Sequence, residues 1–162
     1  MKVVVLGGGS TGEHFVGALR RLDPDVELTL VESRLVGGEC SYFACMPTKT
    51  MLRAAELASS LERAPGMTSQ RPDPAGVWAW RDWVTSDWDD AGQVEWLEGR
   101  RCALVRGFGR VLRPGMLVVD DTEIAYDGLV AQLATGMPVQ HLDAILDLAD
   151  PAVRESPVAH HP

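Results

Sequence analysis

The chain has 162 residues, 46% of them hydrophobic, which suffices for one ordinary globular core but not for two large domains. Its net charge of -8 argues against a nucleic-acid partner, because phosphate backbones are bound by clusters of unpaired Lys and Arg. No apolar run approaches the roughly eighteen residues that a membrane span requires, so the composition predicts a cytoplasmic protein without a membrane partner. Three cysteines are too few for a disulfide framework, which leaves a redox or metal role open.

The first 32 residues predict a βαβ unit. Residues 3–6 form a compact β-branched run that stops at a glycine-rich turn, and apolar residues recur at helical spacing over residues 15–22. A second strand follows over residues 26–31 and ends at Glu32. Strands joined by such a helical crossover are expected to be parallel.

Two helical regions follow the βαβ unit. The first is expected to begin around Pro47-Thr48, because proline suits a first helical turn, and to end by Pro65-Gly66. The second covers residues 77–97 as one helix or two and carries all five tryptophans. Their mixed helical spacing is typical of core residues.

Short strands are expected in the last part of the chain. From Cys102 the period shortens toward two, which predicts a small antiparallel meander that returns to a last core strand. Residues 141–162 lack both period and apolar density and are expected to form an unstructured tail. The sequence therefore predicts an α/β fold, with a Rossmann-like parallel sheet and a small antiparallel β-meander, in one domain over residues 1–140.

The glycine-rich turn has the spacing of a dinucleotide-binding site. Gly7, Gly9 and Gly12 lie between a strand and a helix, and Glu32 ends the next strand twenty residues after Gly12. The first glycine allows the tight turn, the second lets the backbone approach a pyrophosphate, and the third lets the helix lie close to the strand. A carboxylate at Glu32 would bind ribose hydroxyls and repel a 2′-phosphate, which favours FAD or NAD over NADP. The alternative is a structural turn with an exposed glutamate.

Two of the three cysteines lie five positions apart in "GGECSYFACMPTK". In a regular helix, the rise alone would separate the Cα atoms of Cys40 and Cys45 by roughly 7.5 Å, beyond the roughly 7 Å reach of a disulfide. A bridge therefore requires a distorted turn, for which Gly37-Gly38 and Pro47 are suitable flanking residues. Cys45 would then lie near a helix N-terminus, where the helix dipole favours a thiolate.

Other interpretations of the reactive residues stay open. A metal site at the two cysteines needs further ligands, for which His14 and Cys102 are the nearest candidates. Cys102 is more simply a half-buried packing residue in a strand. The acids Asp87, Asp89 and Asp90 are more typical of a solvated face than of a cation site.

The motif G-G-x-C-x4-C-x-P-x-K after a dinucleotide fingerprint resembles the FAD domain of the pyridine nucleotide-disulfide oxidoreductases, the group of dihydrolipoamide dehydrogenase, glutathione reductase and mercuric reductase. The resemblance extends over roughly residues 2–140. It implies a FAD-dependent oxidoreductase in which Cys45 lies beside the flavin, Cys40 exchanges with the substrate disulfide and Lys49 approaches the reactive part of the flavin. The implied cofactor-binding residues are Gly7, Gly9, Ser10, Thr11, Gly12, Glu32, Ser33, Gly38, Lys49, Ala134, Thr135 and Gly136.

The resemblance covers only the amino-terminal portion of that family. Its members continue with an NAD(P)-binding domain and a dimerisation domain, for which this sequence has no counterpart. NAD(P)H would therefore serve as electron donor only if another domain or a second chain completed the site. The alternative function is a FAD- or ADP-binding module without turnover of its own, from a truncated or split gene.

Overall fold

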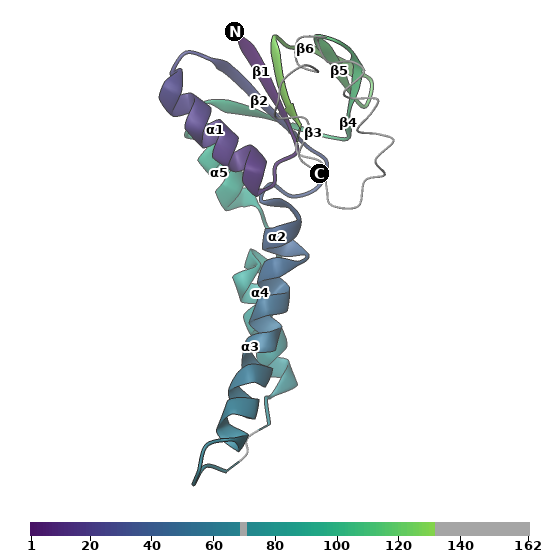
Figure 1. Cartoon of the computed structure of the whole chain (residues 1–162). Coiled ribbons are helices and arrows are strands. Elements are labelled where there is room, and N and C mark those ends of the chain that lie inside the picture. The colour runs from purple at the N-terminus through teal and green to yellow at the C-terminus, as the bar shows by residue number, and fades with distance from the viewer. Residues whose placement is uncertain (69–70, 132–162) are drawn as a thin grey trace, which may run out of the picture.

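The structure, a computed structural model, describes residues 1–68 and 71–131. It consists of a head, which contains two β-sheets, and a long helical arm (Figure 1). Along the chain the elements are β1 (Lys2–Leu6), α1 (Ser10–Leu22), β2 (Glu27–Glu32), α2 (Gly38–Tyr42), α3 (Cys45–Glu62), α4 (Pro74–Val84), the 3-10 turn η1 (Ser86–Trp88), α5 (Ala91–Glu98), β3 (Cys102–Arg106), β4 (Gly109–Arg113), β5 (Met116–Val119), β6 (Thr122–Ala125) and β7 (Gly128–Ala131).

The main sheet of the head is parallel and has the strand order β3-β2-β1-β7. The predicted βαβ unit is therefore confirmed, and β7 is the expected last core strand. The register pairs Leu6 with Val31 in β2 and with Ala131 in β7, so the three carboxyl ends lie at one edge of the sheet. In such sheets the ligand binds beyond that edge, which directs attention to the loops that follow β1 and β2.

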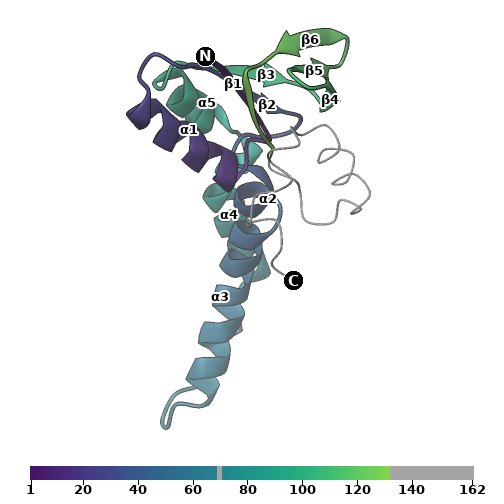
Figure 2. The ribbon, with the colours of Figure 1, turned by 45° about the horizontal axis from the view of Figure 1, so that its top comes forward.

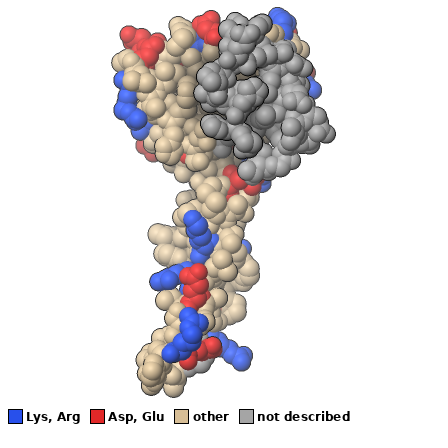
Figure 3. Space-filling model, in the orientation of Figure 1, with Lys and Arg blue, Asp and Glu red and all other residues tan. Residues whose placement is uncertain are grey.

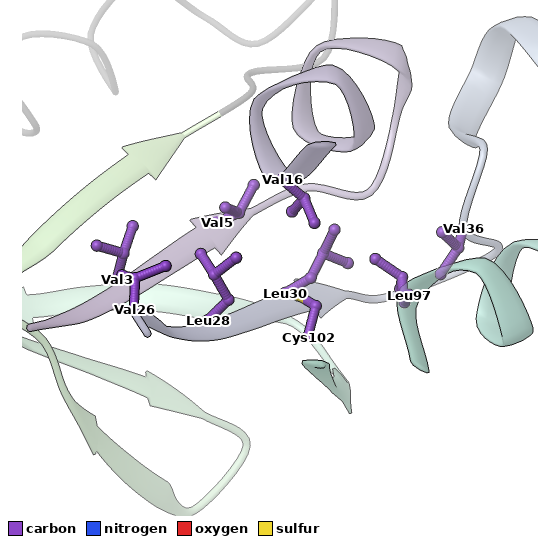
Figure 4. Packing of buried hydrophobic residues seen from close by; sticks show 9 residues of the cluster. All are labelled: Val3, Val5, Val16, Val26, Leu28, Leu30, Val36, Leu97 and Cys102. Atoms are coloured by element: carbon purple, nitrogen blue, oxygen red, sulfur yellow. The ribbon is translucent and has the colours of Figure 1, made fainter. Parts of the chain in front are cut away.

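Helices cover one face of this sheet, and the meander β4-β5-β6 covers the other (Figures 1 and 2). The larger apolar cluster joins alternate residues of β1 and β2 to Val16 of α1, Leu97 of α5 and Val36 (Figure 4). A smaller cluster places Leu117 and Val119 of β5 against the opposite sheet face. The antiparallel meander was predicted correctly, but β3 lies outside it and extends the parallel sheet beside β2.

The arm consists of α3 and α4, which pack along one another and project from the head (Figures 1 and 2). Helix α3 begins at Cys45, two residues earlier than expected from the proline. The second helical region is two helices, α4 and α5, joined through η1. Within the described residues, no helix is both long and apolar enough to cross a membrane.

The prediction that the tryptophans are core residues is wrong for four of the five. Trp96 is partly buried and packs against the larger apolar cluster. The other four are exposed, and Trp83 is the most exposed of them, with 68% of its surface accessible to solvent. Three of these tryptophans lie on α4 and the fourth on η1. Their spacing is helical, but α4 has no buried residue in the described structure, so the helix does not bury them in a core. The exposed four are Trp78, Trp80, Trp83 and Trp88.

Candidate functional site

The turn between β1 and α1 is built around glycines. Gly7 has φ 103°, a conformation that side chains rarely adopt, and its N–H donates to the Val31 carbonyl at 2.8 Å. A Cβ on Gly12 would lie 2.1 Å from the Gly7 carbonyl oxygen and 3.2 Å from Val5. Helix α1 therefore approaches the turn as closely as its backbone allows, which is the packing expected of the third glycine in the fingerprint.

The amino end of α1 begins directly at this turn. Gly9 is the N-cap residue and supplies no side-chain acceptor, while Ser10 and Thr11 are exposed in the first helical turn. A helix N-terminus of this kind favours an anionic group, because its N–H groups and dipole both point outward. The three residues occupy the positions at which phosphate contacts were predicted.

Glu32, at the end of β2, holds the turn through its carboxylate. One oxygen accepts from the Gly8 N–H at 2.7 Å, and the other accepts from the Arg34 N–H at 2.7 Å. The acid thus lies against the glycine turn, as its spacing in the sequence indicated, with exposed Ser33 next to it. Its two backbone contacts show that the carboxylate also orders the loops around it.

The loop that follows β2 packs directly on the glycine turn. The Gly37 N–H donates to the Gly8 carbonyl at 2.7 Å, and a Cβ on Gly38 would lie 2.8 Å from the Cα of Gly9. Both Gly37 and Gly38 have positive φ, at 110° and 66°. These two glycines lead into α2, so the turn and the cysteine segment form one continuous surface.

Two residues that the sequence interpretation missed fix this loop. Asp90 is buried, and its carboxylate accepts from the Val36 N–H at 2.7 Å and from the Arg106 guanidinium at 2.6 Å. The expectation that Asp90 belongs to a solvated acidic face is therefore wrong. One signal in the sequence could have indicated this role. Arg106 ends β3 level with Glu32 of the neighbouring strand β2, so its cation lies at the ligand edge of the sheet, where an acid could bind it.

The cysteine segment has the distorted turn that its spacing requires. Helix α2 ends at Tyr42, and both the Phe43 and Ala44 N–H groups donate to the Glu39 carbonyl, at 2.9 and 2.7 Å. Helix α3 then begins at Cys45. The chain therefore changes direction between the two cysteines, so that their side chains are not separated by a straight helical rise.

This change of direction brings Cys40, Cys45 and Lys49 together. The neighbouring Cys45 thiol raises the pKa of Cys40, and the Lys49 charge partly opposes the shift. All three cysteines are free thiols in this structure.

The candidates for a metal site lie apart. Cys102 is buried in the core cluster between β2 and the helices, and burial raises its pKa to about 11. It is therefore more deeply buried than the expected half-buried strand residue. His14 hydrogen-bonds its own helix at the Ser10 carbonyl. Across residues 1–68 and 71–131, no group of three or more His, Cys, Asp or Glu side chains is placed to hold a metal ion.

The predicted site residues thus fall into three sets. The turn and the acid after β2 lie together, and the cysteine segment adjoins them through Gly37 and Gly38. Ala134, Thr135 and Gly136, the third predicted set, lie outside the described residues.

Comparison with known sequences assigns this chain to one protein family. The sequence profile of the family "Pyridine nucleotide-disulphide oxidoreductase" matches residues 1–153. A dihydrolipoyl dehydrogenase of Thermus scotoductus is 32% identical over 142 residues, which are 85% of this chain and 30% of that protein. A mercuric reductase of Staphylococcus aureus is 27% identical over 92% of this chain and 25% of its own length.

Solved structures show the same fold. LpdA from Mycobacterium tuberculosis superposes with a TM-score of 0.67 at 20% identity, over 81% of this chain and 31% of LpdA. The HOCl-induced flavoprotein disulfide reductase RclA from Escherichia coli has a TM-score of 0.62 at 18% identity, over 85% of this chain and 30% of RclA. The chain thus spans less than a third of the length of these relatives.

Proposed function

Because this chain belongs to the pyridine nucleotide-disulfide oxidoreductases, we propose that it is the FAD-binding portion of an oxidoreductase that passes electrons from NAD(P)H to a Cys40–Cys45 disulfide. The observation that carries this proposal is the packing of Gly37 and Gly38 on the glycine turn. It joins a nucleotide-binding element to a thiol pair within a few residues. Neither element alone would favour this function over simple nucleotide binding.

The residues of the site fit FAD. Glycine at position 38 lets this loop pack directly on the backbone of Gly9, and α1 begins there with no side-chain cap, where a pyrophosphate would bind. Glu32 lies where it would bind the adenosine ribose, and Ser10, Thr11 and Ser33 are exposed beside it. When bound, the flavin would supply two-electron chemistry between a nicotinamide and a disulfide. Ala134, Thr135 and Gly136 are proposed to complete the site.

The thiol pair would carry the electrons onward. Reduction of a Cys40–Cys45 disulfide breaks one S–S bond and takes up two electrons and two protons, which yields two thiols. In the reduced pair, the neighbouring Cys45 thiol raises the pKa of Cys40. Lys49 adds a positive charge that acts on Cys40 and would stabilise the thiolate that attacks an acceptor disulfide.

The length of the match favours a second candidate. Relatives are more than three times as long as the matched segment, and by the family resemblance nicotinamide binding belongs to a portion outside that segment. Without it, the chain would act as a FAD- or ADP-binding module that does not turn over. Both candidates use the same glycine turn and differ in whether the thiol pair is reduced by NAD(P)H.

A FAD titration followed by NADH addition tests both candidates. We expect the wild type to bind FAD and Gly9→Val to lose at least about a hundredfold in affinity, because a side chain would fill the space in which backbone meets pyrophosphate. Gly92→Val is the matched control, since a Cβ at Gly92 meets no atom within 4 Å. Equal affinity of a folded Gly9→Val variant would contradict the phosphate-turn assignment. Bleaching by NADH supports the oxidoreductase, and bound flavin that NADH does not bleach supports the module.

A further inference from the structure

The backbone turn that joins the arm to α5 has an unusual conformation. Ser86, Asp87 and Trp88 have φ values of 51°, 51° and 59°, and none of them is glycine. Left-handed conformations cost L-residues roughly 1–2 kcal/mol each and persist only where the surroundings enforce them. A turn that keeps this strained conformation fixes the direction of the side chains on it, and the last of these is Trp88.

The turn is enforced from the helix before it. Thr85 is almost fully buried, and its hydroxyl donates to the carbonyls of Arg81 and Asp82 at 3.1 and 3.0 Å. The Trp88 N–H then donates to the Thr85 carbonyl at 2.9 Å, which closes the turn. Arg81 also lies over the Trp88 ring, with its guanidinium carbon 5.1 Å from the ring centroid. These contacts fix both the backbone and the ring of Trp88.

The indole fixed in this way reaches the thiol segment. Trp88 Nε1–H donates to the Tyr42 carbonyl at 3.0 Å, across 46 positions of sequence. Tyr42 is the last residue of α2, where a carbonyl has no partner within its own helix. The chain changes direction immediately after it, between Cys40 and Cys45. The indole therefore satisfies a carbonyl that lies between the two cysteines in the chain.

The Tyr42 side chain provides a second contact that holds the end of α2. It is buried, and its hydroxyl donates to Gln93 Oε1 at 2.9 Å. Its ring lies against the Gly37 turn, where a Cβ would approach Tyr42 Cε2 to 2.8 Å. The end of α2 is thus held between the glycine loop on one side and the η1–α5 segment on the other.

We infer that Trp88 is a positioning residue for the thiol pair: its indole N–H holds the end of α2 so that the Cys40 and Cys45 sulfurs stay within bonding reach. This inference rests on the proposed function, because it assumes that the two thiols form a disulfide. A held geometry favours intramolecular disulfide formation, since the sulfurs need no ordering when the bond forms. Loss of the indole contact should therefore shift the thiol–disulfide equilibrium towards the dithiol.

Equilibration of the full chain with glutathione measures this shift. One glutathione disulfide oxidises the thiol pair and yields two glutathione thiols and one protein disulfide, so electrons and protons balance. Alkylation and mass spectrometry give the oxidised fraction at each glutathione ratio. We expect Trp88→Phe, which keeps a ring but loses the donor, to lower the equilibrium constant roughly fivefold, the equivalent of one ordinary hydrogen bond.

Trp83→Phe is the matched control. Trp83 lies on the arm, 68% exposed, with its ring stacked on Trp80 at 4.7 Å between centroids. Its substitution should leave the equilibrium constant within twofold of the wild type. Tyr42→Phe offers a second test, because it removes the bond to Gln93 and leaves the backbone carbonyl in place. It should also lower the constant, which a role in overall stability alone would not do.

The outcomes separate this inference from the proposed function. A wild type that forms the Cys40–Cys45 disulfide, with Trp88→Phe within twofold of it, overturns the positioning role of Trp88 and leaves the function intact, whatever the result for Tyr42→Phe. A wild type that forms no such disulfide overturns both. A loss in Trp88→Phe but not in the control Trp83→Phe, at unchanged circular dichroism, supports the inference.

Discussion

The head and the arm of this molecule are stabilised in different ways. In the head, a parallel sheet lies between helices on one face and an antiparallel meander on the other, and both faces carry buried side chains. In the arm, α4 contributes none and α3 only Pro47 and Thr50, both in its first two turns. Figure 3 shows positive and negative side chains close together in a column along the arm, with uncharged surface on either side of it. The chemistry is placed where the two regions meet.

This difference shows what each region contributes to the site. The head fixes the glycine turn and Glu32 through buried apolar residues, so its geometry depends on packing. The thiol segment is fixed instead by hydrogen bonds, from the Val36 N–H to the Asp90 carboxylate and from the Trp88 indole N–H to the Tyr42 carbonyl. Disturbing the head should therefore reduce global stability, whereas disturbing the arm should act locally.

The largest expected effect is the loss of a buried side chain in the head. Leu30 is fully buried between β1, α1 and α5, and Leu30→Ala should cost about 2–5 kcal/mol of unfolding free energy. Leu52→Ala in the arm, where the side chain is 53% exposed, should cost less than about 1 kcal/mol. Urea denaturation followed by circular dichroism compares them. Equal losses would contradict the distinction between head and arm.

Thiol reactivity compares buried Cys102 of the head with exposed Cys40 of the thiol segment. With a pKa of about 11, Cys102 is about one-thousandth thiolate at pH 8, so it should react with iodoacetamide about a hundredfold more slowly than free cysteine. Its rate should rise tenfold per pH unit until the pH approaches 11. Cys40 is exposed and should be labelled before Cys102 in reduced protein. Mass spectrometry against time gives both rates, and early labelling of Cys102 would contradict its burial.

A capping residue should alter the arm alone. The Asp73 carboxylate accepts from the N–H groups of Ala75 and Gly76 at 3.2 and 3.0 Å at the start of α4. Asp73→Ala should cost about 1 kcal/mol. Hydrogen exchange should then accelerate roughly fivefold for α4 amides and stay unchanged in β1 and β2, because the arm opens locally. Equal acceleration in the sheet would show that the two regions unfold together.

The smallest effect concerns Glu13, a half-buried carboxyl of the head. It lines a cavity of about 350 Å³ between α1 and α5, and burial raises its pKa above the usual 4.5. A raised carboxyl pKa means that the stability it contributes is present at low pH and is lost as the pH rises through the folded-state value. Glu13→Gln should therefore stabilise the protein by about a few tenths of a kcal/mol at pH 7, with solvent screening limiting the gain.

The same comparison at pH 3.5 is the internal control for Glu13. The gain of Glu13→Gln should disappear there, because the wild-type carboxyl is then protonated in both states. Glu56→Gln in the arm, with a 65% exposed side chain, should show less difference between the two conditions. A Glu13→Gln gain that is the same at both pH values would point to packing in place of charge.

Local patterns were sufficient to predict the elements around the glycine turn. Strand, turn and helix over residues 2–22 are encoded by neighbouring residues, and so is the proximity of Glu32, because parallel strands end at one edge. The break between the cysteines also followed from spacing and geometry. These features depend on residues close in sequence or on the general rules of parallel sheets.

Features that depend on distant partners were not predictable in this way. Asp90 was assigned to a solvated face because its partners, Val36 and Arg106, lie 54 and 16 positions away. Helical spacing grouped the arm tryptophans on a helix but carried no information about what covers them. Trp88 reaches Tyr42 only because three residues adopt left-handed conformations that no local pattern signals.

The central claim is that the glycine turn is joined to a redox-active pair, Cys40 and Cys45, and thiol counting with mass mapping tests it most directly. Air-oxidised wild-type protein, denatured without reductant, should show one free thiol, assigned to Cys102, and three after mild dithiothreitol. Cys45→Ser should show two free thiols from the start. Three free thiols in oxidised wild type, or a bridge that includes Cys102, would contradict the account.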